Sequence, residues 1–421
     1  MNIELYPKTL RGTINVPSSL NHTIINIILS SLCSTSTTIV NPNYSEETYL
    51  TIDALKKVGT RFKKDQDKLI IIPSKEWKEP LEPIECGIND SIILLLMSLI
   101  SYKIGKVSFH GTPEVIDEIE NQSKSSSSQN ITILKTTETL NVLKIEKTNS
   151  ITLSSNIKPQ NILGSILFAV VTDTEFTIKI NTLSYKNHIS SMLKILDEYS
   201  VNYEHQIQND FQLIIIKNDT LKSPNIIKIE GDWSIGSGLC IMGLTNERLI
   251  LNNLSTESFQ EEKEIINILK NNQSNMSIGT NKITIESSYL QQFNYDLTSF
   301  PYLNIQLLGL ASISEGTSKF NNFDLLNKYD QNKLLETLSI LKDLKADIKL
   351  ENNSVIINGK STLEGGTIKN INDYKIFLML LSILNKCIHP ITILNTNILN
   401  RIDHNFILEL RQLGLQLIYE I

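Results

Sequence analysis

Residues 16–32, VPSSLNHTIINIILSSL, have the composition of an anion-binding loop that leads into a helix. Pro17 and two serines precede an apolar run, and the first N–H groups of a helix have no partner within it, so they can bind a phosphate. Such a site usually adds a Lys or Arg. Leu20 follows the serines, and no Lys or Arg occurs between Leu20 and Lys56. The stretch therefore predicts an anion site without its cation or, alternatively, the ordinary apolar start of a structural helix.

The cysteines and histidines indicate no metal site. The histidines are isolated, and the cysteines form no CxxC pair, which argues against zinc and requires no disulfide. The few arginines limit bidentate anion recognition. The cysteines are Cys33, Cys86, Cys240 and Cys387, and the arginines are Arg11, Arg61, Arg248, Arg401 and Arg411.

Length and charge bound the class of protein. A chain of 421 residues is long enough for two or three domains, and 41% hydrophobic with 20% charged residues is a globular composition. A net charge of −6 argues against a nucleic-acid partner. No apolar run has transmembrane length, since that at 162–171 ends at Thr172 and Asp173. The start of the chain lacks a basic and apolar leader. We therefore expect a cytoplasmic protein without a membrane partner.

The elements that would position any site are repeated along the chain. An apolar helix followed by a short strand recurs with starts roughly 70 residues apart. The copies lie at 23–41, 92–111, 162–181, 236–253, 304–322 and 377–395.

Between these copies the sequence predicts an amphipathic helix and a hairpin, because Leu and Ile recur at helical spacing before Ile-rich pairs of strands. The clear copies lie at 51–72, 192–216, 264–285 and 336–358, and a shorter one ends the chain. The copy at 115–134 contains a serine run, 125–128, that we expect to be a flexible loop. A solenoid would have atypical end units. The end units here are as apolar as the others, which favours six α/β units in closed packing.

Together with this unit order, several fragments make the chain resemble the EPSP synthase family of enolpyruvyl transferases. The resemblance implies an α/β fold of two domains, each with three repeated units around a pseudo-threefold axis, an inverse α/β barrel. It places a discontinuous C-terminal-type domain at 1–18 plus 231–421 and an inserted N-terminal-type domain at 19–230. The fragments are LRGTINVPSS (10–19), DALKKVG (53–59), IECG (84–87), IEGDWS (229–234), LASISEGTSKFNNFDLLNK (310–328) and NDYKI (372–376).

The resemblance also implies a reaction. Family members are transferases of the shikimate pathway that move the enolpyruvyl group of phosphoenolpyruvate to shikimate 3-phosphate, without a metal or organic cofactor. The implied partners are these small anionic substrates, bound by a monomer. Two polyanions require several Lys and Arg side chains. The reaction also requires a carboxylate that helps take the hydroxyl proton.

Most family positions in the first half have lost their charge or reversed it. Leu20 and Ile25 stand for a Lys and an Arg of the first loop, and Leu94 stands for an Arg of the second. Asp90 adds a negative charge there, and Glu118 replaces a third Arg.

Three first-half residues remain candidates for substrate binding. Asn161 ends the triplet that corresponds to the family's Ser-Ser-Gln. Ser184 matches a phosphate-binding serine, and Lys186 lies nearby.

The second half keeps more of the pattern. The Pro-Asp pair that carries the family's base is Pro301-Tyr302, and Tyr is a poor base at neutral pH because its ordinary pKa is about 10. Asp296 is the nearest substitute carboxylate. Lys328 matches the catalytic Lys, and Lys333 could replace a lost Arg if the register slips by one.

The remaining substrate-binding candidates are Asp373 and Lys375, from the family's Asp-His-Arg motif, and Arg401 in place of a late Lys. Lys328, Lys375 and Arg401 could equally be solvated surface cations.

Three hypotheses follow. The chain is a divergent EPSP synthase, a catalytically inactive pseudoenzyme that binds another ligand or a protein partner, or a decaying protein that still folds. Intact core periodicity beside substituted loops favours inactivity. Several lost charged hydrogen bonds, at roughly 1.5–3 kcal/mol each, would remove most substrate affinity.

Overall fold

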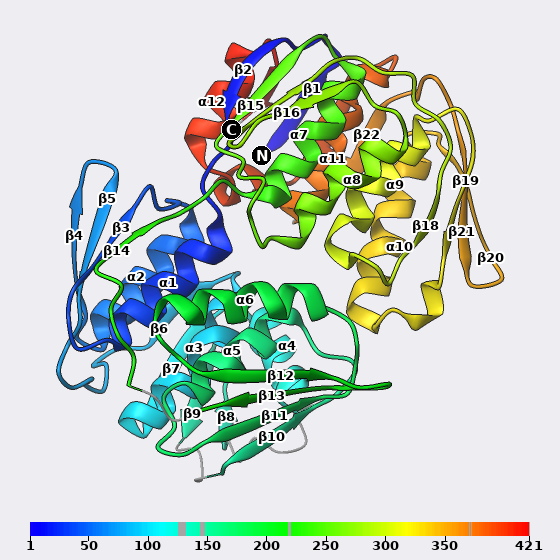
Figure 1. Ribbon diagram of the computed structural model, residues 1–421. Helices are drawn as coiled ribbons and strands as arrows, with labels where there is room; N and C mark the ends of the chain where they lie inside the picture. Colours follow the sequence, from blue (N-terminus) through cyan, green and yellow to red (C-terminus); the bar gives the residue numbers. More distant parts are fainter. Residues whose placement is uncertain (125–131, 144–147, 218–219, 370, 372, 421) are drawn as a thin grey trace. The chain divides into compact units, whose positions relative to one another are not determined.

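The structure, a computed structural model, describes residues 1–124, 132–143, 148–217, 220–369, 371 and 373–420. The serine run 125–128 lies outside these residues. The chain divides into two compact units (Figure 1). Unit 1 comprises residues 1–19 and 230–421, and unit 2 comprises residues 20–229.

Unit 2 carries three of the repeated α/β units. Its helices are α1 (Leu20–Leu32), α2 (Glu46–Lys57), α3 (Asp90–Ile104), α4 (Pro113–Lys124), α5 (Pro159–Ala169) and α6 (Lys186–Glu198). Its strands are β3 (Thr37–Val40), β4 (Arg61–Asp65), β5 (Lys68–Ile72), β6 (Ile84–Gly87), β7 (Lys106–Gly111), β8 (Ile133–Lys135), β9 (Thr139–Leu143), β10 (Ser150–Leu153), β11 (Phe176–Ile180), β12 (Tyr203–Ile207), β13 (Gln212–Ile216) and β14 (Ile226–Lys228).

Unit 1 is built in the same way. Its helices are α7 (Trp233–Thr245), α8 (Ile265–Asn271), α9 (Asn304–Ser312), α10 (Lys328–Asp343), α11 (Tyr374–Ile383) and α12 (His404–Gln412), with 3₁₀ turns η1 (Glu261–Glu264), η2 (Pro301–Leu303), η3 (Phe323–Leu325), η4 (Leu384–Lys386) and η5 (Ile398–Arg401). Its strands are β1 (Asn2–Tyr6), β2 (Gly12–Asn15), β15 (Leu249–Asn252), β16 (Met276–Ile278), β17 (Lys282–Ile285), β18 (Asn294–Asp296), β19 (Gly316–Asn321), β20 (Asp347–Glu351), β21 (Ser354–Gly359), β22 (Gly366–Lys369), β23 (Ile391–Leu394) and β24 (Gln416–Glu420).

The described residues form six four-stranded sheets, three in each unit. In the sheet β6-β7-β9-β8, β6 pairs in parallel with β7, while β9 pairs antiparallel with both β7 and β8. The hairpin supplies the antiparallel pair, and the crossover through α3 supplies the parallel one, as chain connectivity requires. The mixed α/β fold class that the repeats predict is confirmed.

Strands distant in sequence complete the sheets. The N-terminal β1 lies between β23 and β24, where a hairpin strand lies in the other sheets. In Figure 1 this blue strand lies among the last segments of unit 1. Similarly, β14 pairs in parallel with β3, although nearly the whole of unit 2 separates them. In each unit, one sheet therefore joins a strand from the start of the unit's sequence to strands from its end.

The predicted apolar helices are the most buried ones. Every residue of α7 is buried, and α1, α3, α5, α9 and α11 are buried over most of their length. A helix that is apolar all round must be buried on all sides. Gly164 lets α5 approach α3 closely, since a Cβ there would lie 2.1 Å from the Leu94 carbonyl oxygen.

Two short segments, at Pro17–Ser19 and at Glu230–Asp232, carry the chain from one unit to the other and are hydrogen-bonded to each other. The Ser19 N–H donates to the Glu230 carbonyl, and the Asp232 N–H donates to the Pro17 carbonyl, both at 2.8 Å. The Ser19 N–H of the suspected anion loop is thus bound by backbone. Asp232 also caps α7, accepting from the Ser234 N–H at 2.8 Å.

Gly231 lies between these hydrogen bonds in a space that accepts no side chain. A Cβ on Gly231 would lie 1.9 Å from the Asn253 carbonyl oxygen. The Gln260 side chain fastens the same segment, since its Nε2 donates to the Gly231 carbonyl at 2.8 Å and its Oε1 accepts from the Trp233 N–H at 2.9 Å.

We expect Gly231→Ala to lower the free energy of unfolding by about 1–3 kcal/mol, because the new methyl group must displace backbone. Gly279→Ala is the matched control, because a Cβ there meets only the Lys282 carbonyl oxygen at 3.5 Å. Urea unfolding followed by circular dichroism measures both variants. Equal stability of the two variants would contradict this account of the crossing.

Candidate functional site

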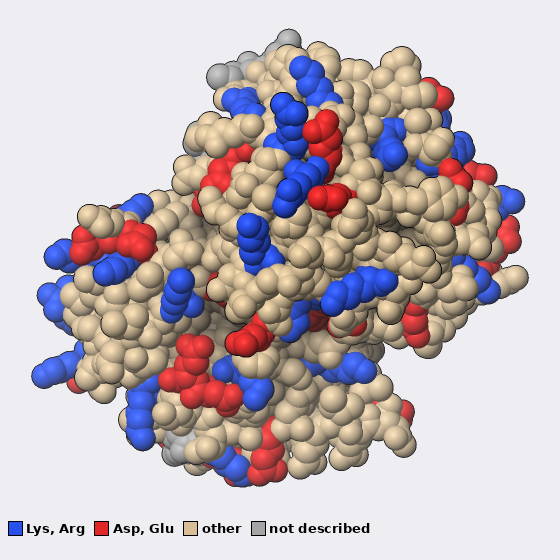
Figure 2. Space-filling view, turned by 45° about the horizontal axis from the view of Figure 1, so that its top comes forward, with Lys and Arg blue, Asp and Glu red and all other residues tan. Residues whose placement is uncertain are grey.

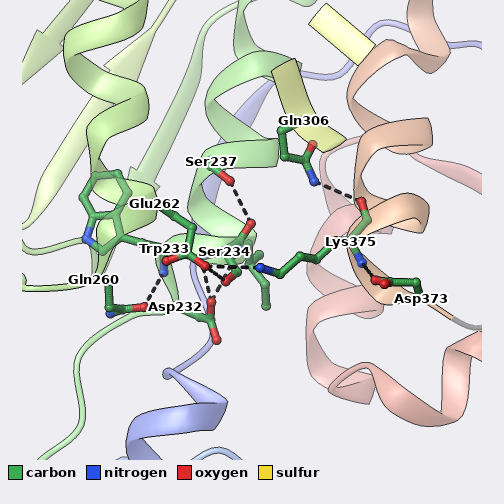
Figure 3. Close-up of polar contacts among 10 residues, drawn as sticks. Asp232, Trp233, Ser234, Ser237, Gln260, Glu262, Gln306, Asp373 and Lys375 are labelled. Atoms are coloured by element: carbon green, nitrogen blue, oxygen red, sulfur yellow. Dashed lines mark hydrogen bonds and ion pairs between the residues drawn. The ribbon is translucent and has the colours of Figure 1, made fainter. Parts of the chain in front are cut away.

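Asp373 begins α11 and anchors the first polar cluster, in unit 1 (Figure 3). Its carboxylate accepts from the Lys375 N–H at 2.8 Å and lies 3.0 Å from Nζ of Lys333 on α10. Burial alone would raise the pKa of Asp373, but the Lys333 charge and these hydrogen bonds outweigh it and lower the pKa. Asp373 is therefore an ionised cap that holds the start of α11.

Lys375 is enclosed by groups of the chain itself. Its Nζ lies 3.4 Å from Oε1 of Glu262 and 3.8 Å from the centroid of the Tyr302 ring. The Lys375 and Glu262 side chains are only 14% and 8% exposed. An anion that approached Lys375 would compete with a carboxylate and with an aromatic face.

Two acidic residues of η1 lie side by side in this cluster. Glu262 accepts from the Ser234 hydroxyl at 2.5 Å, which ties it to the start of α7. Glu261 is 6% exposed, and neither of its carboxylate oxygens has a hydrogen-bond partner of ordinary geometry among the described residues. Burial, and then the neighbouring Glu262, raise the pKa of Glu261 to about 8, against the charge of Lys375. Glu261 is therefore largely protonated at neutral pH.

The expected base position holds no carboxylate, since Tyr302 lies there against Lys375. Asp296, the suggested substitute, caps its own loop. It accepts from the N–H and hydroxyl of Thr298 at 2.9 and 2.7 Å and from the Asn322 amide at 2.9 Å. Burial would raise the pKa of Asp296, but these hydrogen bonds prevail and lower it. A carboxylate so bound is a weaker base.

The other second-half candidates lie at helix ends. Lys328 is the first residue of α10 and is exposed, whereas Lys333, one turn further along, pairs with Asp373. Arg401 ends η5. The structure thus brings Lys333, Asp373 and Lys375 together.

The second polar cluster lies in unit 2, where α3 and α5 begin. Lys158, the N-cap of α5, lies 2.6 Å from Asp90 at the start of α3 and 2.9 Å from Glu118 on α4. The Lys158 side chain is 11% exposed. Two carboxylates around one ammonium group leave a net charge of −1, so the cluster repels phosphate.

The substrate-binding candidates of the first half lie in two separate parts of unit 2. Asn161 is buried in the first turn of α5 and donates from Nδ2 to Oε1 of Gln122 at 3.3 Å, beside the Lys158 cluster. Ser184 and Lys186 lie at the start of α6, where the Ser184 N–H donates to the Thr182 hydroxyl at 3.1 Å. Lys186 is exposed there.

Sequence reasoning missed Lys158, Glu261 and Glu262 as site residues. The adjacent acids in FQEEKE, 259–264, were the available signal, since a carboxyl pair within an apolar repeat often has shifted pKa values. The partners of Lys158 could not be found from local spacing, because Asp90 is 68 residues away.

Other chemistry is limited. The described residues contain no group of three or more His, Cys, Asp or Glu side chains that could hold a metal ion. Cys33, Cys86, Cys240 and Cys387 are buried free thiols. None of the helices in the described part of the chain is long and apolar enough to cross a membrane. On the face shown in Figure 2, basic and acidic side chains are interspersed, unlike the basic stripe of a nucleic-acid surface.

The chain matches known proteins over nearly its whole length. The family model described as EPSP synthase (3-phosphoshikimate 1-carboxyvinyltransferase) matches residues 6–406. The 3-phosphoshikimate 1-carboxyvinyltransferase of Clostridium novyi (strain NT) is 25% identical over 432 residues, covering 98% of this chain and 97% of the relative. That of Clostridium perfringens (strain SM101 / Type A) is 26% identical over 394 residues, covering 90% and 91%.

Two solved structures share the fold. EPSP synthase from Acinetobacter baumannii matches with a TM-score of 0.77 at 16% identity, over 99% of this chain and 100% of its own. The enolpyruvyl transferase NikO from Streptomyces tendae matches with a TM-score of 0.71 at 12% identity, over 99% and 98%. The fold is therefore that of the enolpyruvyl transferases. Within that class, the chain belongs to the EPSP synthase family.

The raised pKa of Glu261 predicts how the free energy of unfolding depends on pH. Its pKa in the folded protein, about 8, lies above the ordinary value of 4.5, so the folded state holds an extra proton between these pH values. The unfolding free energy should therefore fall as pH rises from 5 to about 8, by up to about 1.4 kcal/mol per pH unit.

Glu261→Gln should flatten this slope, since the amide keeps the shape of the protonated acid and cannot ionise. Glu264→Gln, in the same turn, is the control and should keep the wild-type slope. Denaturant unfolding at several pH values measures it. Parallel pH profiles for wild type and Glu261→Gln would show that Glu261 is ionised in the folded protein.

Proposed function

We propose that this chain is a pseudoenzyme of the EPSP synthase family, which keeps the fold but does not transfer enolpyruvyl from phosphoenolpyruvate to shikimate 3-phosphate at the family's rate. One observation carries the proposal: the two most enclosed cations near the matched positions, Lys158 and Lys375, are paired with carboxylates of the chain itself. Lys158 pairs with Asp90 and Glu118, and Lys375 pairs with Glu262. The conserved fold then serves to bind a different, less anionic ligand or a partner protein, and we place it in the cytoplasm as a monomer.

Energetics support this reading. A phosphate would have to displace the carboxylates from Lys158, which is only 11% exposed. Separating a charged pair in such a place costs roughly 1.5–3 kcal/mol for each lost bond. Asn161, Ser184 and Lys186 can offer neutral hydrogen bonds and one exposed cation, which replace little of that loss.

The chemical step also lacks a suitable base. Deprotonation of the acceptor hydroxyl requires a group whose pKa lies near the working pH. Tyr302 lies against a cation, Asp296 is a hydrogen-bonded carboxylate of lowered pKa, and Glu261 is buried. Lys328 remains as an exposed cation at the first position of α10.

The test is phosphate release by the purified chain given shikimate 3-phosphate and phosphoenolpyruvate, together with thermal shifts for each substrate. We expect no turnover above background and a shift under about 1 °C, because substrate binding well below saturation adds little stability. The Clostridium novyi relative, assayed in parallel, controls for substrate quality.

A second candidate is a divergent EPSP synthase that still performs the reaction. Lys333, Asp373 and Lys375 favour it, because unit 1 keeps cations at the starts of α10 and α11. Turnover that Lys328→Ala abolishes, with Lys342→Ala on the same helix as the control, would establish this candidate and overturn the first.

A further inference from the structure

A cavity of about 840 Å³ lies in unit 2. Its lining includes the last residues of α1, Lys103 near the end of α3, and the segment 170–173 that follows α5. The loop after β5, at 73–77, provides a further wall. The volume is in the range of small-molecule sites.

The cavity is distinct from the Lys158 cluster. Asp90 and Lys158 lie at the N-terminal ends of α3 and α5, whereas the cavity adjoins the C-terminal ends of the same helices. Lys103 lies 13 positions after Asp90 on α3, which is about 20 Å at 1.5 Å per residue. One rigid helix therefore joins two separate places in unit 2.

Part of the cavity lining is apolar. Val170 and Leu221 are buried there. The Ser31 and Thr172 hydroxyls donate to the Ile27 and Ala169 carbonyls, each at 2.8 Å, and so satisfy their own helices. The apolar part of the lining, which includes Val170 and Leu221, favours a hydrocarbon group.

Two further residues shape the recognition. Burial raises the pKa of Cys33 to about 11, so its thiol is neutral and not a nucleophile. Trp77, half-buried in the loop after β5, adds an indole wall that packs well against a flat apolar group.

The exposed lining residues carry both signs of charge. Lys75 and Lys103 are basic, and Glu76 and Asp173 are acidic. The C-terminal ends of helices add negative potential, which favours an ammonium group. A ligand with one charge meets an attractive and a repulsive pair here, whereas a zwitterion is attracted by both.

We propose that this cavity binds a small zwitterion with an apolar or aromatic body, such as a free amino acid with a large apolar side chain. The ammonium group pairs with the acidic rim, the carboxylate pairs with Lys75 and Lys103, and the apolar body lies against Trp77.

Three probes with one carbon skeleton test the charges by calorimetry on the full chain: L-phenylalanine, phenethylamine and 3-phenylpropionate. We expect phenylalanine to bind about fivefold more tightly than either singly charged analogue, the effect of one exposed ion pair. Lys75→Glu with Lys103→Glu should reverse the order in favour of phenethylamine. The control pair, Lys63→Glu with Lys106→Glu, lies on exposed strand positions outside the cavity lining and should keep the wild-type order.

Trp77 tests the location. Trp77→Ala should weaken phenylalanine binding about three- to tenfold through lost aromatic contact. Trp233 is the only other tryptophan of the chain and is fully buried in unit 1, so Trp77→Phe should abolish any ligand-induced change in tryptophan emission. Three outcomes would overturn the proposal. The three probes could bind equally tightly, or Trp77→Ala could leave phenylalanine binding unchanged. Phenylalanine could also fail to bind at about 10 mM, a concentration at which even a weak small-molecule site would be occupied. These readouts do not depend on turnover, so they can fail or succeed independently of the proposed function.

Discussion

The two passages of the chain between the units are joined by backbone hydrogen bonds, and much of the architecture depends on this junction. The Ser19–Glu230 and Asp232–Pro17 bonds fix the points where α1 and α7 begin. The same passages lead directly from β2 and from β14, strands that complete a sheet in different units. Gly231 has no space for a side chain, so the passages can approach at backbone distance. The points where the chain passes between the units are therefore fixed by a few backbone groups.

Apolar packing within each unit allows the fold to persist whatever side chains the helix starts carry. Buried helices such as α3, α5, α7 and α11 are held by apolar packing along their length, so their first turns can change side chains at little cost to the core. Helix starts attract negative charge. In this chain, Asp90, Asp232 and Asp373 supply that charge internally. A position that would favour a bound anion is thereby stabilised by the chain's own carboxylate.

Sequence reasoning recovered the periodic part of the molecule. Apolar helices, Ile-rich hairpins and six units follow from local spacing, because the side-chain pattern of a helix or strand is set by its own geometry. The proximity of Asp373 and Lys375 also follows from their spacing at a helix start. The pairing of Lys375 with Glu262 does not, since 113 residues separate them and only tertiary packing brings them together. The sequence also does not show that Lys333, and not Lys328, pairs with Asp373, because this depends on how α10 packs against the start of α11.

The proposal that the chain's own carboxylates block anion binding is tested most directly at the Lys158 cluster. Calorimetric titration of shikimate 3-phosphate should give no saturable binding to the wild type. Asp90→Asn with Glu118→Gln should gain at least about tenfold in affinity, equivalent to about 1.4 kcal/mol. Adding Lys158→Met should remove the gain. If the wild type instead binds shikimate 3-phosphate as tightly as the double variant, these carboxylates do not block anion binding and the account is contradicted.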